Sequence, residues 1–184
     1  FKDLNGDGII DIQDQTYIGN PTPEITYGIT ADMAWKGFEF NVFFAGTEGN
    51  DIFKNFVRYD FTYVNRPSSA LERWTGPGTS NNEPRVNLSD PNQNARVSDR
   101  FIEDGSYLRL KTLQIGYNLP AAWLSKMKFE KFKIYMTAQN LITFTKYSGL
   151  DPEIGNVGGS LEIGIDRGFY PQARTIMGGV SLTF

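Results

Sequence analysis

The chain of 184 residues contains no cysteine and no histidine. Without cysteine it can form neither a disulfide framework nor a thiolate metal site. No serine has the glycine-flanked context of a nucleophile elbow, and the carboxylates of Glu103 and Asp104 stand before Gly-Ser, which is typical of a turn that opens a strand. We therefore expect no enzyme activity, and a glycosidase that uses this carboxylate pair is the enzymatic alternative.

An excess of positive charge and a long hydrophobic run are also missing. The formal net charge is −3, which gives no electrostatic basis for a nucleic-acid partner. No run approaches the ~18 consecutive apolar residues of a membrane-spanning helix. Mean hydropathy is −0.37, but the strands of a transmembrane β-barrel also average out as polar, because they alternate. Composition therefore leaves both a water-soluble protein and an outer-membrane barrel open.

Apolar and polar residues alternate in several stretches, which is typical of β-strands. Residues 24–36 and 38–46 alternate on either side of Lys36-Gly37 and predict a β-hairpin. A later stretch changes parity, and a β-bulge near Lys111-Thr112 would return its apolar residues to one face. The remaining predicted strands, which complete an antiparallel meander of five, cover 107–117, 132–144 and 172–184.

The connections between these strands differ greatly in length. Short connections, 36–37 and 118–130 (a turn or short helix), lie at one end of the meander with the C-terminus. Long connections, at about 50–104 and 145–170, lie at the other end. Outer-membrane barrels show this asymmetry, with short periplasmic turns and long extracellular loops. We therefore expect an all-β fold in which residues 24–184 form strands of a large transmembrane β-barrel, with the long loops outside the cell.

In such a barrel the apolar faces contact membrane lipid, and the polar faces, with Arg109 and Lys111 among them, line a wet interior. The last strand ends on Phe184, on the apolar face. In a barrel we expect Phe184 to belong to the periplasmic aromatic girdle and to act as a barrel-assembly signal. Alternation is equally typical of a sandwich of two sheets. The alternative is therefore a soluble, calcium-stabilised β-sandwich that binds carbohydrate.

The segment before the first strand, 1–23, contains "DLNGDGIIDIQD", whose oxygen-bearing residues have the spacing of a twelve-residue calcium loop. Calcium prefers six to eight hard oxygen ligands, and a glycine follows the third of them. Asp14 stands where a longer glutamate is usual, so we expect altered geometry or weaker binding. The sequence predicts a structural Ca²⁺ in an extracellular loop; an Asx turn without an ion is the alternative. The predicted ligands are Asp3, Asn5, Asp7, the carbonyl of Ile9, Asp11 and Asp14.

Several motifs in order resemble the C-terminal end of the SusC/RagA-type TonB-linked outer-membrane transporters. They are "FKDLNGDGIIDIQD", "IGNPTPEITYG", "RWTGPG", "SDRFIEDGSYLRLKTLQIGYNLP" and "IYMTAQNLITFTKYSGLDPEI", followed by the closing aromatic strand. The resemblance covers nearly the whole chain. It implies that these residues supply about the last five strands of a twenty-two-stranded, multi-pass barrel in the cell outer membrane.

The same resemblance implies a function and partners. A transporter of this type imports oligosaccharides, or peptides in some branches, under a hinged SusD-like surface lipoprotein. Energy coupling would come through TonB, by way of an N-terminal part of the protein that is missing from these residues. Since the chain begins at Phe1 without methionine, we expect a fragment or a processed piece. Aromatic loop residues that could stack on sugar rings or contact the lipoprotein are Tyr59, Tyr63, Trp74 and Tyr147.

Overall fold

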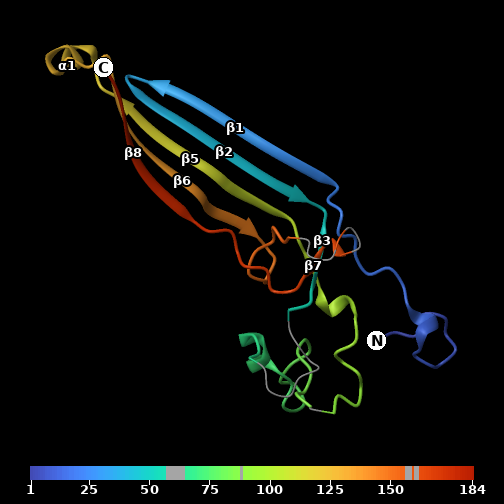
Figure 1. Ribbon diagram of the computed structural model, residues 1–184. Helices are drawn as coiled ribbons and strands as arrows, with labels where there is room; N and C mark the ends of the chain where they lie inside the picture. Colours follow the sequence, from blue (N-terminus) through green and yellow to red (C-terminus); the bar gives the residue numbers. More distant parts are fainter. Residues whose placement is uncertain (57–64, 88, 156–158, 160–161) are drawn as a thin grey trace.

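The main element of the fold is a five-stranded antiparallel sheet with the strand order β1-β2-β5-β6-β8 (Figure 1). The computed structural model describes residues 1–56, 65–87, 89–155, 159 and 162–184. The meander that alternation predicted is confirmed, with the hairpin at its start. The strands are β1 (Ile25–Trp35), β2 (Phe38–Glu48), β5 (Tyr107–Asn118), β6 (Lys131–Thr145) and β8 (Thr175–Thr183).

Cross-strand pairing gathers the apolar residues of the five strands on one face of this sheet. Directly paired residues of antiparallel strands point to the same side, so all residues of a row across the sheet lie on one face. An apolar row runs Met33–Phe40–Ile115–Met136–Gly178. The neighbouring row, on the opposite face, runs Asp32–Asn41–Gln114–Thr137–Met177.

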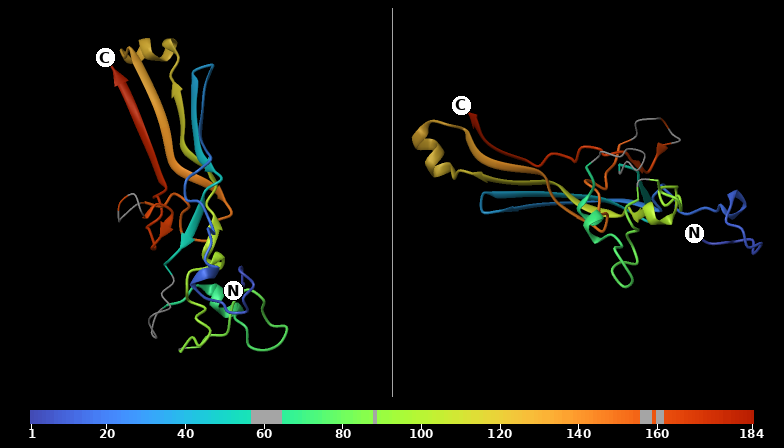
Figure 2. Two further views of the ribbon diagram at one scale, coloured as in Figure 1. Left: turned by 90° about the vertical axis from the view of Figure 1, so that its right-hand side faces the viewer. Right: turned by 90° about the horizontal axis from the view of Figure 1, so that it is seen from below.

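The apolar face of the sheet has no second layer packed on it among the described residues. Trp35 is 66% exposed and Ile134 is 49% exposed, and two further views show the five strands as one curved layer (Figure 2). A sandwich would have buried these side chains between two sheets about 10 Å apart. The alternative of a soluble β-sandwich is therefore wrong.

A pair of bulges keeps the apolar residues of β5 and β6 on one side. The register between β2 and β5 skips Lys111, since Phe44 pairs with Leu110 and Phe43 with Thr112. The predicted bulge is thus confirmed, and it lets Leu110 and Leu113 share a face despite their odd spacing. The register between β5 and β6 shifts at the same level. There Asn140, in β6, has a left-handed backbone with φ of 51°.

The two ends of the sheet are built differently, as the connection lengths predicted. The turn end holds the Lys36-Gly37 turn, the short helix α1 (Ala121–Met127) and the C-terminus (Figure 1). Both turn residues have positive φ, 47° and 91°, which matches the tight hairpin turn that follows strand twist. The loop end holds the long connections and the N-terminal segment. No helix among the described residues is long and apolar enough to cross a membrane.

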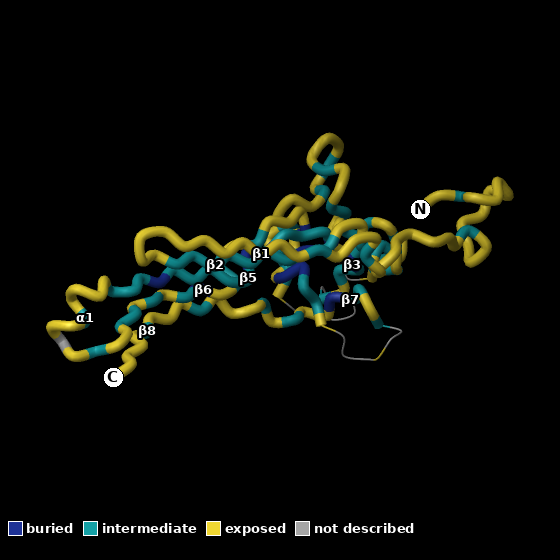
Figure 3. Tube along the Cα trace, turned by 90° about the horizontal axis from the view of Figure 1, so that it is seen from above, coloured by how far each residue is buried: buried dark blue, intermediate teal, exposed yellow. Residues whose placement is uncertain are grey.

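A small three-stranded sheet, order β4-β3-β7, lies at the loop end and was not predicted. It consists of β3 (Asp51–Lys54), β4 (Ile102–Asp104) and β7 (Ile165–Asp166), and its β3–β7 pairing is parallel. These strands are too short to show alternation, and they fall inside the connections that were expected to be loops. Most buried residues gather near this sheet (Figure 3). Short 3₁₀ turns complete the elements at Ile12–Asp14, Ser68–Glu72 and Asp99–Phe101.

Candidate functional site

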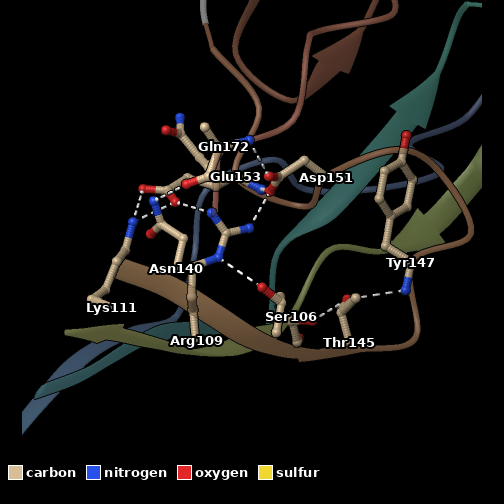
Figure 4. Close-up of polar contacts among 11 residues, drawn as sticks. Ser106, Arg109, Lys111, Asn140, Thr145, Tyr147, Asp151, Glu153 and Gln172 are labelled. Atoms are coloured by element: carbon tan, nitrogen blue, oxygen red, sulfur yellow. Dashed lines mark hydrogen bonds and ion pairs between the residues drawn. The ribbon is translucent and has the colours of Figure 1, made fainter. Parts of the chain in front are cut away.

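A buried arginine on the polar face of the five-stranded sheet holds the connection between β6 and β8. Arg109, in β5, is only 2% exposed. Its Nε donates to Thr143 Oγ1 on β6 at 2.9 Å, its Nη1 donates to Glu153 Oε2 at 2.8 Å, and its Nη2 donates to Asp151 (Figure 4). The guanidinium therefore joins two neighbouring strands and the connection in one set of charge-assisted hydrogen bonds.

Lys111 and two backbone groups extend this set of contacts. Lys111 Nζ donates to Glu153 Oε1 at 2.7 Å, so Glu153 lies between two cations. Asp151 also accepts the backbone N–H groups of Glu153 and Gln172, each at 2.9 Å. Gln172 lies close to the start of β8. We call Arg109, Lys111, Asp151 and Glu153 the Arg109 clamp, because they fasten both ends of the connection to the sheet.

Sequence reasoning found only half of the clamp. Strand parity placed Arg109 and Lys111 on the polar face. The pairing register confirms this for Arg109, and Lys111, which the register skips, reaches the same Glu153 carboxylate. Their acidic partners were missed, because Asp151 and Glu153 lie in a connection without periodicity. A signal in the sequence could have found them: two carboxylates stand on either side of Pro152, shortly after the end of a strand that contains no acidic residue.

A second set of polar contacts joins three long segments of the loop end. Lys54 Nζ, in β3, donates to Glu103 Oε1 at 2.8 Å and to Ser148 Oγ at 2.7 Å. The backbone N–H of Ser148 donates to Glu103 Oε2 at 2.7 Å. Burial raises the pKa of the Glu103 carboxyl, but the hydrogen bonds from Lys54 and Ser148 outweigh it, so the net pKa is below the ordinary value.

Tyr147, one of the aromatic residues predicted to contact cargo or the lipoprotein, packs inside this loop end. It is 6% exposed, and its hydroxyl donates to Asp166 Oδ2, in β7, at 2.6 Å. Burial and this carboxylate raise the pKa of the Tyr147 hydroxyl far above its ordinary value. The structure gives Tyr147 a packing role, and a contact with cargo stays a prediction. Tyr59 and Tyr63 lie outside the described residues.

The predicted calcium loop is an exposed turn whose carboxylates accept backbone N–H groups. Asp3 accepts from Gly6 at 2.6 Å and from Gly8 at 2.8 Å, which curls the loop around its glycines. Asp14 accepts from Leu4 at 2.7 Å and from Asp11 at 2.9 Å, and these hydrogen bonds lower the pKa of its carboxyl. Within the described part of the chain, no three acidic side chains are grouped closely enough to hold a metal ion.

The donor types of this loop nevertheless suit calcium. Every predicted ligand presents carboxylate, amide or carbonyl oxygen, which is the hard donor set that Ca²⁺ prefers. A carboxylate oxygen that accepts one N–H keeps a second lone pair for a metal. The first and last predicted ligands accept from neighbouring backbone groups: Asp14 accepts the N–H of Leu4, and Asp3 accepts the N–H of Gly6. Calcium binding stays a prediction.

A cleft of about 1240 Å³ separates the N-terminal segment from the loop that follows Trp74. Trp74 lies in its wall, and its backbone N–H donates to the carbonyl of Glu83 at 2.8 Å. A contact of Trp74 with cargo stays a prediction. Arg100 Nη2 pairs with Glu83 Oε2 at 2.7 Å. Amide side chains from the loop also line the cleft: Asn81, Asn82, Asn92 and Asn94.

Phe184 lies at the turn end, as expected of a girdle residue. It is 81% exposed, and its ring contacts the ring of Phe129 with centroids 5.4 Å apart. Phe129 in turn lies 6.4 Å from Phe132, measured between ring centroids. Aromatic side chains therefore cluster where β6 begins and β8 ends. A role for Phe184 in barrel assembly stays a prediction.

Known proteins of similar sequence are TonB-dependent receptors. Over the whole of this chain, TonB-dependent receptor P3 of Formosa agariphila is 35% identical and TonB-dependent receptor SusC of Bacteroides thetaiotaomicron is 32% identical. The chain spans only 19% and 17% of the length of these two relatives. No protein-family profile matches the chain.

Solved structures of similar fold come from the RagAB peptide importer. In its 'open-open' state, one chain matches 89% of this chain with 28% identity and a TM-score of 0.71, and the match covers 17% of that chain. In the 'closed-closed' state the match covers 97% of this chain with 25% identity and the same TM-score.

A single-layered sheet with one continuous apolar face and one polar face, matched over its length to this transporter, is part of a large transmembrane β-barrel. The resemblance found in the sequence is confirmed: the chain is a segment of a SusC/RagA-type TonB-dependent receptor of the outer membrane. Its relatives are receptors and importers, not enzymes, which agrees with the expectation of no enzyme activity.

Proposed function

We propose that the receptor containing this chain imports nutrients across the outer membrane. The observation that carries the proposal is the two-faced sheet: mainly apolar rows across it alternate with mainly polar rows, as a wall between lipid and an aqueous interior requires. Similarity to the RagAB peptide importer supports the same function. The loop end would be extracellular and the turn end periplasmic, in keeping with the loop lengths of outer-membrane barrels.

Two partners follow from the relatives. A SusD-like lipoprotein would cover the loop end as a lid; similarity to SusC and to the RagAB peptide importer supports this partner. TonB would supply energy through a part of the receptor outside this chain. Co-purification tests the first partner: affinity-tagged receptor, extracted from outer membranes with mild detergent, should retain a lipoprotein encoded with it. A receptor that always purifies alone would contradict this assembly.

We propose oligosaccharides as the cargo. Trp74 offers an aromatic surface for a sugar ring, and the asparagine side chains of the cleft offer hydrogen-bond donors and acceptors for hydroxyl groups. Peptides are the second candidate, because the similar RagAB is a peptide importer.

Uptake by whole cells distinguishes the two classes of cargo. Cells lacking their own copy of the receptor would be supplied with the wild-type gene, and uptake of fluorescent oligosaccharides and peptides would be measured with and without a protonophore. Energy-dependent sugar uptake should fall with Trp74→Ala. It should be unchanged with Trp123→Ala, which alters an exposed tryptophan of α1 at the opposite end of the sheet. Uptake of peptides alone would refute the sugar assignment.

The N-terminal segment is proposed to bind one structural Ca²⁺ through Asp3, Asn5, Asp7, Ile9, Asp11 and Asp14. Its role would be to stiffen an exposed loop, because the chain after it leads into β1 rather than into the second helix of a switch. Isothermal titration of the purified receptor with Ca²⁺ should lose one site in Asp3→Ala. The site should persist in Asp32→Ala, which removes a carboxylate from β1 instead. An unchanged stoichiometry in Asp3→Ala would refute calcium binding by this loop.

A further inference from the structure

Two arginines of the cleft beside Trp74 have their flat faces covered by aromatic rings. Arg96 lies over the ring of Phe1, 3.4 Å from its centroid, and Arg85 lies over the ring of Trp74 at 5.3 Å. Stacking fixes the plane of a guanidinium while leaving its N–H edge free to form hydrogen bonds. Neither arginine forms an ion pair with any carboxylate of the described residues.

Arg96 also carries a polar atom that lacks a partner. Its Nε is buried, and it forms no hydrogen bond with any group of the described chain. A buried donor without an acceptor costs free energy, and the cost is larger for a charged group than for a neutral one. Arg96 lines the cleft, and its terminal N–H groups, unlike the enclosed Nε, are not buried, so an acceptor from outside the chain can reach them.

The acidic groups of the cleft are largely engaged elsewhere. Glu83 pairs with Arg100. Asp14 accepts two backbone N–H groups of its own loop, and Asp11 accepts that of Gln13 at 2.7 Å. Both are predicted calcium ligands, so a bound Ca²⁺ would neutralise them. Of the described carboxylates that line the cleft, Asp99 alone would then keep a negative charge that neither an ion pair nor a metal balances.

We propose that this cleft binds an oligosaccharide that carries negative charge, as a carboxylate or a sulfate ester on the sugar. The N–H edges of Arg85 and Arg96 would hold the anionic group with paired hydrogen bonds. Asn81, Asn82 and Asn94 would bind the neighbouring hydroxyl groups. This inference rests on the proposed import of oligosaccharides and names the chemical class of the cargo. Calcium in the adjacent loop strengthens binding, because it removes the charges of Asp11 and Asp14 from one wall.

Calorimetry with the full-length receptor in detergent tests the assignment. Oligogalacturonate carries a carboxylate on each sugar, and a galactose oligomer of equal length is its neutral counterpart. The charged oligomer should bind at least tenfold more tightly, and added salt should reduce that preference. Arg96→Gln should weaken its binding by about tenfold or more, because hydrogen bonds to a charged group are lost. EDTA should weaken it as well.

Two further variants separate recognition from folding. Arg73→Gln removes a guanidinium of the same loop that lies outside the cleft and donates to the carbonyl of Ala70 at 3.4 Å, so it should leave affinity unchanged. Arg96→Lys keeps the charge but loses the planar fork, so its affinity should lie between wild type and Arg96→Gln. Equal affinity for the charged and neutral sugars, or no effect of Arg96→Gln, would overturn this inference but not sugar import. Binding of acidic peptides and of no sugar would overturn both.

Discussion

Replacing Arg109 by methionine should detach the connection between β6 and β8 from the sheet without unfolding the barrel. Methionine keeps most of the side-chain volume but leaves Asp151, which is 5% exposed, as a buried carboxylate without its cation. Removing one partner of a buried ion pair costs about 3–5 kcal/mol. A difference of about 1.4 kcal/mol changes an equilibrium constant tenfold. The equilibrium between the connection attached to the sheet and the detached connection should therefore shift toward detachment by roughly a hundred to several thousand times.

Hydrogen exchange followed by mass spectrometry measures this loss locally. The amides of Glu153 and Gln172 both donate to Asp151, so their exchange reports directly on the clamp. In the full receptor held in detergent, the Arg109→Met variant should exchange the amide hydrogens of Glu153 and Gln172 faster than wild type, by a large part of the factor expected for detachment. Amides in the middle of β5 and β6 should keep their protection, because the strand ladder does not depend on the clamp.

Lys146→Met is the matched control. Lys146 belongs to the same connection and pairs with Asp104 at 3.8 Å, but its side chain is 88% exposed. Exposed pairs contribute about 0–1 kcal/mol, so exchange at Glu153 and Gln172 should change by no more than a few fold. Equal exchange in Arg109→Met and Lys146→Met would show that the buried arginine does not hold the connection, and the reasoning would fail.

Three further outcomes are expected. Phe184→Asp should lower the amount of heat-modifiable, folded receptor in the outer membrane, and wild-type levels would contradict a role in assembly. Deleting Lys111 alone leaves Leu113 on the apolar face, so the barrel should still assemble. Deleting Lys111 and Thr112 together turns Leu113 toward the interior and should abolish assembly. Equal behaviour of the two deletions on heat-modifiability gels would refute the assigned bulge. Because the pKa of Glu103 is lowered in the folded protein, its contacts stabilise the loop end above the ordinary glutamate pKa of about 4.3 and are lost as pH falls through the folded value. Exchange of the Ser148 amide, corrected for intrinsic rates, should therefore rise only in acid, and this acid step should be absent in Glu103→Gln.

The sequence was sufficient for the sheet because a membrane wall imposes a strict period of two. Alternation located all five long strands, and a single break in parity located the bulge at Lys111. The unequal connections predicted which end holds the C-terminus. Each of these inferences depends on local spacing alone, so none required knowledge of distant contacts.

The loop end could not be predicted in the same way. β3, β4 and β7 are four, three and two residues long, which is too short for a period to appear. Their pairing brings together segments more than fifty residues apart, such as Phe53 and Ile165. The Arg109 clamp has the same origin, since Asp151 reaches Arg109 only after β6 has returned along β5. Tyr147 shows the consequence: an aromatic residue that suggested a ligand contact is buried by segments that local patterns do not reveal.

The distribution of charge decides which face of the sheet meets lipid, independently of any relative. Six charged residues lie on the polar face within the strands: Asp32, Glu39, Arg109, Lys111, Lys131 and Lys133. An arginine or lysine on the lipid side of a barrel costs about 2–4 kcal/mol at the bilayer midplane, and less toward the interfaces, and an acid costs less than either. If this face met lipid, each of these charges would add a cost, and the face would be the less stable side against hydrocarbon. The opposite face carries Trp35, Ile134 and Val180, and exposing these apolar side chains to hydrocarbon costs no free energy. The clamp is therefore inside the barrel, and the connection that it holds lies against the path that cargo would take.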